Sequence, residues 1–372
     1  MTIGADASAT FGSDDPGFFN FSEYNNSVLR MVRVDVSAAV KMGPHLTLLT
    51  EVRTENLGGV RPYAFYLRIR PWTSRNVDIQ VGRVPPTFGA FARRTYTNDN
   101  PLVGYPLAYQ YPTSLRPDAV PASADELLRK RSLGWLVKYS IGNPEAGSGV
   151  PLMTAFSWDT GVQVHGTAGM VRATGSLTAG TLSNPVFRDD NGGPQVAGRI
   201  ELRPVTGVIA GVSVARGPFV ARSATRDAIG TGHDDDFTQK AWGGDLEYSR
   251  AHYLMRFETI VSDWRLPVVS PPPLQTPLQT PLRAVSMSVE TRYGLRPGFY
   301  VAARYDHLGF SEIAGVSETL PWDAPVTRIE IGAGYSIQRN LLLKLSVQHN
   351  ARDGGVLLRR ANLLASQLVY WF

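Results

Sequence analysis

Arginine and carboxylate side chains are the groups in this sequence with the clearest capacity for chemistry. Lysine occurs only at positions 41, 130, 138, 240 and 344, so most of the 37 basic residues are arginine. Arginine presents a planar fork of N–H donors that binds carboxylates and other anions through two parallel hydrogen bonds. Acidic residues interleave with these arginines, which argues against a nucleic-acid binder with its basic blocks. The arrangement predicts fixed ion pairs, a charged surface that orients polar solutes, or both.

Recognisable catalytic and metal-binding patterns are absent from the sequence. The chain has no cysteine, and none of its six histidines lies in a G-x-S-x-G or H-E-x-x-H motif. We therefore predict that the protein is not an enzyme and holds neither a metal nor a cofactor. A lipid hydrolase remains an alternative, because a serine and a histidine on neighbouring strands would leave no local motif.

Apolar and polar residues alternate along most of the chain, a pattern typical of β-strands. In the stretch "RVDVSAAVKM", Val34 and Val36 lie on one face, while Arg33 and Asp35 lie on the other. In "PYAFYLRIR" the same alternation places Tyr63, Phe65, Leu67 and Ile69 opposite Tyr66, Arg68 and Arg70. No apolar run approaches the ~20 residues of a transmembrane helix.

Counting these segments predicts sixteen strands in a single domain that spans residues 1–372. They lie near 2–11, 28–42, 45–56, 61–71, 77–84, 158–168, 171–183, 196–204, 206–216, 240–250, 252–264, 284–294, 298–307, 325–337, 340–350 and 362–372. Short and long connections alternate, which predicts an all-β, up-and-down antiparallel barrel with both termini at one end. Residues 132–157 could add a hairpin and raise the total to 18, and residues 123–131 predict one short helix.

The charged face of these strands predicts the wall of a water-filled lumen. The predicted lumen wall consists of Arg33, Arg53, Arg199, Arg203, Arg256, Arg292, Arg304, Arg328, Glu51, Glu201, Glu258, Glu290 and Glu330. Cross-strand ion pairs between these residues would stiffen the wall. A transverse field that orients solutes at a constriction is the other interpretation, and the two are compatible.

The long connection at residues 85–157 is a candidate constriction. Loops of this length usually carry a function, and its aromatic residues are too many for a loop in open water. We expect it to fold into the lumen. The predicted constriction and solute-binding residues are Arg68, Arg70, Arg93, Arg94, Arg116, Arg131, Tyr105, Tyr109 and Tyr111. The arginines would favour anions and the tyrosines could stack on sugars; alternatively, these groups only pack the loop against the wall.

The last eleven residues, "NLLASQLVYWF", resemble the C-terminal strand of bacterial outer-membrane β-barrels. The resemblance rests on Leu364, Leu368, Tyr370 and Phe372, which occupy alternate positions up to the final residue. It implies that this strand closes the barrel and is recognised by the barrel-insertion machinery. A soluble sandwich or propeller is the alternative, in which the apolar face would be buried.

The stretch "VGRVPPTFGAF" at 81–91 resembles the Gly-x-Phe-x-x-Pro-Phe-Gly segment of phosphate-selective porins. It departs from that pattern at Val84 and Thr87, and the chain lacks a lysine-rich lining. The resemblance therefore implies the porin class and not phosphate specificity.

Together these observations predict an outer-membrane porin-like channel for passive diffusion of small polar solutes, with a mild preference for anions. The termini would be periplasmic, the apolar face would contact outer-membrane lipid, and three copies could associate. The alternatives are a non-conducting barrel that serves as a scaffold for a partner protein, and the lipid hydrolase.

Overall fold

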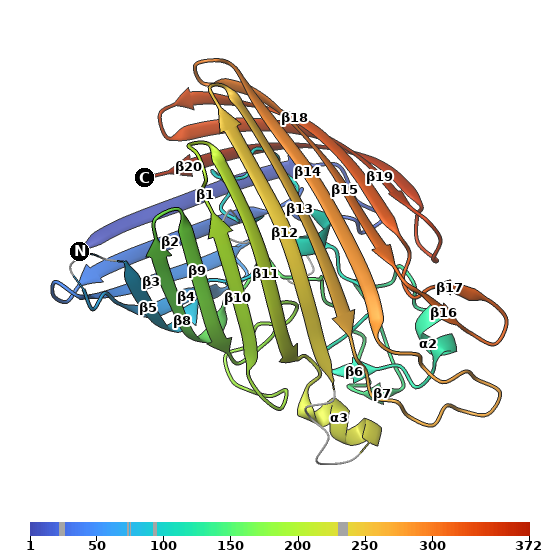
Figure 1. Cartoon of the computed structure of the whole chain (residues 1–372). Coiled ribbons are helices and arrows are strands. Elements are labelled where there is room, and N and C mark those ends of the chain that lie inside the picture. The colour runs from blue at the N-terminus through green and yellow to red at the C-terminus, as the bar shows by residue number, and fades with distance from the viewer. Residues whose placement is uncertain (22–26, 73, 75, 92–94, 230–236) are drawn as a thin grey trace.

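Sixteen antiparallel strands close into one barrel in the computed structural model of this protein (Figure 1). That count refers to the described residues, which are all of 1–372 except 22–26, 73, 75, 92–94 and 230–236. The barrel strands are β1 (Thr2–Gly12), β2 (Val32–Lys41), β3 (Leu46–Glu55), β4 (Val60–Ile69), β5 (Val77–Val84), β8 (Asp159–Ala168), β9 (Val171–Thr178), β10 (Gln195–Leu202), β11 (Val208–Pro218), β12 (Thr238–Arg250), β13 (Tyr253–Trp264), β14 (Leu282–Arg296), β15 (Phe299–Phe310), β18 (Val326–Gln338), β19 (Leu341–Arg352) and β20 (Arg360–Trp371).

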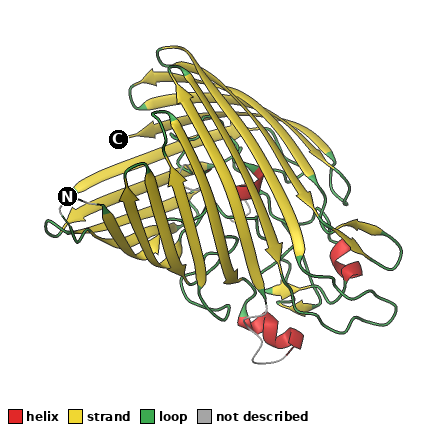
Figure 2. Cartoon of the chain, viewed as in Figure 1, coloured by secondary structure: helices red, strands yellow, loops and turns green. Residues whose placement is uncertain are grey.

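Short elements decorate the connections between barrel strands (Figure 2). The described residues include two small sheets, one formed by β6 (Ala119–Val120) with β7 (Ile141–Gly142) and one by β16 (Glu312–Ala314) with β17 (Thr319–Pro321). They also include the helices α1 (Leu107–Gln110), α2 (Ala124–Leu128) and α3 (Arg222–Ile229). Ser123 caps α2 by accepting a hydrogen bond from the backbone N–H of Glu126. This helix lies within residues 123–131, where the sequence predicts one short helix.

The prediction of sixteen strands is confirmed, and the alternative of 18 is wrong. Residues 132–157 contribute only β7, which pairs with β6 and not with the barrel. The physical reason is close packing of two backbone segments. A Cβ atom on Gly134 would lie 1.8 Å from the carbonyl oxygen of Pro112, and one on Gly149 would lie 1.7 Å from that of Thr113. This segment is therefore committed to the loop itself.

The last strand closes the ring. β20 pairs with β1 in a register that runs from Asp6 opposite Trp371 to Gly12 opposite Ala365. Figure 1 shows the two termini near each other at one end of the barrel, the end that carries the short turns. The four residues behind the C-terminal resemblance, Leu364, Leu368, Tyr370 and Phe372, are all exposed on the outside of this strand.

Apolar residues of the strands are exposed and charged residues are buried, the reverse of the arrangement in a soluble protein. On β18, Ile331 is 60% exposed while the neighbouring Glu330 is fully buried. On β19, Val347 is 55% exposed while Gln348 is 1% exposed. Apolar side chains thus point away from the barrel axis and charged ones point inward, so the alternative of a soluble sandwich or propeller is wrong. No helix in the described part of the chain is long and apolar enough to cross a membrane.

A charge placed on the outer face should be costly in proportion to its depth in the membrane. We expect Ile331→Arg, near the middle of β18, to lower the free energy of unfolding by about 2–4 kcal/mol. Ile337→Arg, on the same face near the end of the same strand, should cost only about 0–1 kcal/mol. Urea unfolding in lipid vesicles, followed by tryptophan fluorescence, measures both values. Equal costs at the two depths would contradict a lipid-facing outer surface.

Candidate functional site

Residues 85–157, here called the plug loop, cross the interior of the barrel. The Tyr96 hydroxyl donates to Glu51 on β3 at 2.7 Å, and the Tyr109 hydroxyl donates to Glu258 on β13 at 2.7 Å. The backbone N–H of Gly104 donates to Glu330 on β18 at 2.9 Å. These partners lie on distant parts of the ring, so the loop spans the lumen. Figure 2 shows loop segments and a short helix inside the ring of strands.

The backbone of the plug loop lies close to the wall at Gly104. A Cβ atom at this position would lie 2.6 Å from Oε2 of Glu330 and 2.3 Å from Nε2 of Gln348. A larger residue here would have to displace the ends of these two side chains.

Lys344 on β19 anchors the next part of the plug loop. Its ammonium group donates to the backbone carbonyls of Thr97, Asn100 (2.7 Å) and Leu102 (3.5 Å), and to the side-chain oxygen of Gln367 (3.0 Å). The side chain is 1% exposed. Three carbonyls turned toward one cation fix this segment in place, because each would otherwise be buried without a donor.

The three predicted tyrosines of the plug loop all bind the wall through their hydroxyl groups. Tyr105 accepts a hydrogen bond from Arg33 at 2.5 Å, and Tyr111 accepts one from Arg352 at 3.0 Å. Tyr109 donates to Glu258, as described above, and all three rings are buried. Burial raises the pKa of Tyr111 to about 12, so this hydroxyl stays protonated. Contact of these rings with a solute stays a prediction.

Arg116 holds the plug loop together from within. Its guanidinium donates to both carboxylate oxygens of Asp118, at 2.9 and 2.8 Å, and to the carbonyls of Val137 and Glu145. Burial favours the neutral acid, but the hydrogen bonds from Arg116 and Asn143 outweigh it and lower the pKa of Asp118. The pair is therefore ionised at neutral pH.

The other predicted basic residues lie apart from Arg116. Arg131 is 9% exposed and contacts the backbone carbonyl of Asp353 at 3.5 Å. Arg68 and Arg70 lie at the short-turn end of β4 and share Asp78, at 3.2 and 3.1 Å. No hydrogen bond within the described residues joins these two to Arg116 or Arg131. Arg93 and Arg94 lie outside the described residues.

Arg304 is the centre of an ion-pair network on the wall. Its three guanidinium nitrogens bind Asp306 at 3.0 Å, Glu290 at 3.3 Å and Glu330 at 2.7 Å. The Arg304 side chain is completely buried, and the three carboxylates are at most 7% exposed. Arg256 extends the network by binding Glu290 at 3.0 Å and Glu247 at 2.8 Å.

The remaining predicted wall residues fall into three groups. Ion pairs join Arg33 to Glu55, Arg53 to Asp35, Arg199 to Asp245, and Glu201 to Arg203. Arg328 instead binds the backbone carbonyls of Tyr105 and Phe19, so it anchors loops. Arg292 is exposed and lies 4.2 Å from the ring centre of Tyr300.

The sequence pattern did not identify several residues of this interior, among them Tyr63, Asp323 and two arginines described below, Arg61 and Arg83. Tyr63 was placed on the same face as Phe65, but a register shift between Glu51 and Val52 turns it inward, where it is 3% exposed. Pro62 was the available signal, because proline within a strand marks an edge or a bulge. Asp323 gave no signal in the sequence.

Asp323 joins the plug loop to the connection between β17 and β18. Its carboxylate accepts hydrogen bonds from the backbone N–H groups of Ser114 and Ser132, both at 2.7 Å, and from that of Ala324. Burial raises the pKa of Asp323 above its usual range, and these donors offset the shift only in part. The residue therefore fixes two separate turns of the plug loop.

Three arginines surround a cavity of about 240 Å³ between the plug loop and the wall, here called the arginine cavity. Arg53, Arg61 and Arg83 line it, together with aromatic residues that include Tyr63 and Phe187. Arg53 and Arg61 face each other directly across β3 and β4. Like charges in such a cross-strand pair repel each other, and the ion pair of Arg53 with Asp35 offsets part of that repulsion.

The guanidinium groups of the arginine cavity are held in place by aromatic rings. Arg53 lies 3.6 Å from the ring centre of Tyr63, and Arg83 lies 3.8 Å from that of Phe187. The two terminal nitrogens of Arg53 have no hydrogen-bond partner among the described residues. Both nitrogens are buried, and one of them lies 3.9 Å from a carboxylate oxygen of Glu51.

Comparisons with known proteins point to one fold. No protein-family model matches the sequence, and no curated protein matches it either. OmpF of Salmonella typhi, solved with daunomycin, aligns with a TM-score of 0.58 at 11% identity, covering 100% of this chain and 97% of that one. The anion-selective porin of Comamonas acidovorans aligns with a TM-score of 0.54 at 9% identity, covering 100% and 99%.

A trimer form of OmpT from Vibrio cholerae aligns with a TM-score of 0.53 at 10% identity, covering 100% of this chain and 98% of that one. At identities this low, the likeness concerns the fold. The chain has the closed-barrel fold of the outer-membrane porins, as the alternating pattern and the C-terminal strand predicted.

Proposed function

We propose that this protein is an outer-membrane channel through which small polar solutes diffuse passively, with a mild preference for anions. The observation that carries the proposal is the closed ring of strands, apolar outside and charged inside, with a loop that narrows its interior. Only a closed barrel lets a sheet satisfy its backbone hydrogen bonds in a bilayer. Both termini would then lie in the periplasm, because they share the end with the short turns.

The preference for anions is supported by the arginine cavity. Three guanidinium groups line this cavity, and the two terminal nitrogens of Arg53 have no hydrogen-bond partner among the described residues. The anion-selective porin of Comamonas acidovorans has the same fold. Arg116 and Arg131 lie deeper in packed parts of the plug loop, so we assign the solute path to the arginine cavity rather than to these two residues.

Selectivity in planar bilayers tests this proposal. The reversal potential in a KCl gradient should show a preference for chloride. Arg61→Gln/Arg83→Gln should lower the chloride-to-potassium permeability ratio by roughly twofold for each charge, since one charge acts through water with a few tenths of a kcal/mol. Arg339→Gln, in an exposed short turn, should leave the ratio unchanged. Cation selectivity of the unmodified protein would contradict the preference.

The other proposed functions make different predictions for the same preparation. A non-conducting scaffold for a partner protein would give no conductance steps from correctly folded barrel. A lipid hydrolase would release fatty acid from phospholipid vesicles, and we propose that this chain does not.

Assembly and membrane insertion follow from the same proposal. OmpT of Vibrio cholerae adopts a trimer form, and we propose that three copies of this chain also associate. We further propose that the exposed face of β20, with Leu368, Tyr370 and Phe372, is recognised by the barrel-insertion machinery. The mass of the detergent-solubilised protein tests the first, and truncation of the final residue tests the second.

A further inference from the structure

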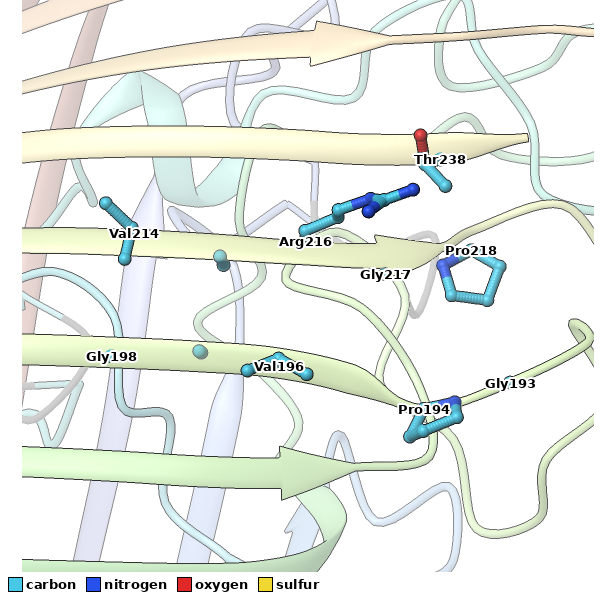
Figure 3. A pocket seen from close by; sticks show the side chains of 11 residues that line it. Gly193, Pro194, Val196, Gly198, Val214, Arg216, Gly217, Pro218 and Thr238 are labelled. Atoms are coloured by element: carbon cyan, nitrogen blue, oxygen red, sulfur yellow. The ribbon is translucent and has the colours of Figure 1, made fainter. Parts of the chain in front are cut away.

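A hollow of about 640 Å³, here called the outer groove, lies over strands β10 and β11 near their loop ends. Figure 3 shows Val196, Gly198, Val214 and Arg216 lining it, with Pro194 at its end. Val196 and Val214 are 60% and 61% exposed, and they lie on the same face as the other apolar residues that point away from the barrel. The groove therefore opens toward the membrane and not into the lumen.

The floor of the outer groove is low because Gly198 has no side chain. The nearest atom to a Cβ placed there would be a Val214 methyl carbon at 3.8 Å, an ordinary contact distance, so a larger residue would fit. The glycine is thus not required by the backbone. It leaves an apolar gap beside Val196 and Val214.

A row of basic residues runs along the same face at the end of the groove. In the strand register, Arg216 on β11 lies opposite Lys240 on β12. Lys240 lies opposite Asp263 on β13, which in turn lies opposite Arg283 on β14. These four residues lie on the same face of neighbouring strands, because residues paired across strands share a face. Trp242 lies on this face two residues along β12 from Lys240 and is 42% exposed. Tryptophan at such a position marks the membrane–water boundary.

The charges in this row do not cancel. Asp263 binds Arg283 through two hydrogen bonds, at 2.7 and 2.9 Å. Arg216 and Lys240 have no ion pair with any described residue, and both are exposed. Two cations that lack an ion-pair partner among the described residues are costly beside hydrocarbon unless an anion of the lipid headgroups meets them.

We propose that the outer groove with Arg216 and Lys240 is a binding site for a phosphorylated, acylated lipid of the surrounding leaflet. The phosphate would lie between the two cations, and one acyl chain would occupy the gap over Gly198. The combination favours a lipid over a free anion, because the apolar groove and the basic row are continuous. This proposal requires the barrel to lie in a membrane, but it does not depend on whether the barrel conducts.

The test uses the refolded full chain in vesicles of phosphatidylcholine mixed with phosphatidic acid, one lipid at a time carrying brominated chains that quench tryptophan. The quenching of Trp242 is obtained as the difference between the protein and its Trp242→Phe variant. Brominated phosphatidic acid should quench Trp242 more strongly than brominated phosphatidylcholine. Arg216→Gln/Lys240→Gln should reduce the relative association constant by about fivefold per residue, the effect of one basic group at an anionic surface.

Matched variants separate the two parts of the site. Arg250→Gln/Arg296→Gln removes the same charge from exposed positions near the opposite end of the barrel and should leave the association constant unchanged. Gly198→Leu fills the groove and should lower association while leaving β-sheet circular dichroism intact. Equal quenching by the two lipids, or no effect of either site variant, would overturn the proposal. Full displacement by excess inorganic phosphate would also overturn it, since the site would then bind a free anion.

Discussion

Replacing residues 98–131 with a short Gly-Ser linker is expected to raise the single-channel conductance several-fold. The segment contains the backbone that Lys344 and Glu330 hold across the lumen, and it contains buried Tyr105 and Tyr109. Removing it opens the interior of a sixteen-stranded ring, and a barrel of this size leaves an aqueous channel when it is not filled. Planar-bilayer recording in KCl measures the change.

A matched deletion distinguishes this effect from general loosening of the loops. Removing residues 268–271, a partly exposed part of the connection between β13 and β14, should leave the conductance unchanged. Folding of both variants is checked by their migration with and without heating. An unchanged conductance after removal of 98–131 would mean that solutes do not pass where this segment lies.

Arg304→Met is expected to lower the free energy of unfolding by about 3–5 kcal/mol, the cost of leaving a buried charge without its partner. Here Asp306, Glu290 and Glu330 all lose a hydrogen-bonded cation. Glu330 also accepts the backbone N–H of Gly104, so the variant should loosen the plug loop as well. Urea unfolding in lipid vesicles, followed by tryptophan fluorescence, gives the free energy.

Two further variants make this measurement specific. Arg292→Met removes an exposed arginine from β14 whose contact is the ring of Tyr300, and it should cost less than about 1 kcal/mol. Arg304→Lys keeps the charge but cannot bind three carboxylates with a planar fork, so it should fall between the two. If Arg304→Met unfolds at the same urea concentration as the unmodified protein, the network does not stabilise the barrel.

The barrel could be predicted from the sequence because apolar residues face outward and charged residues face inward. Every strand therefore alternates between the two kinds of residue. Val34 and Ile331 face the membrane for the same reason, and the count of strands follows from the number of such segments. Tyr63 was misplaced because one bulge reverses the parity of a strand locally. The alternation of residues along a strand shows which face a side chain lies on, but not its position along the barrel axis. Arg68 and Arg116 were therefore grouped, although they lie in separate networks.

The path of the plug loop could not be predicted because its partners are remote in the chain. Lys344 lies 247 residues after Thr97, and Asp323 lies 209 residues after Ser114. Local propensity and periodicity contain no information about such contacts. The aromatic content of the loop correctly indicated burial. It could not indicate that the hydroxyls of Tyr109 and Tyr111 would bind Glu258 and Arg352.

The attachment of the loop to Lys344 has a consequence for the order in which the molecule is made. Lys344 belongs to β19, the last strand but one, so the ribosome produces the loop long before the residue that fastens it. During export the early half of the chain therefore travels with an unfastened segment rich in aromatic residues. A chain that ended before β19 would lack the residue that fastens this segment.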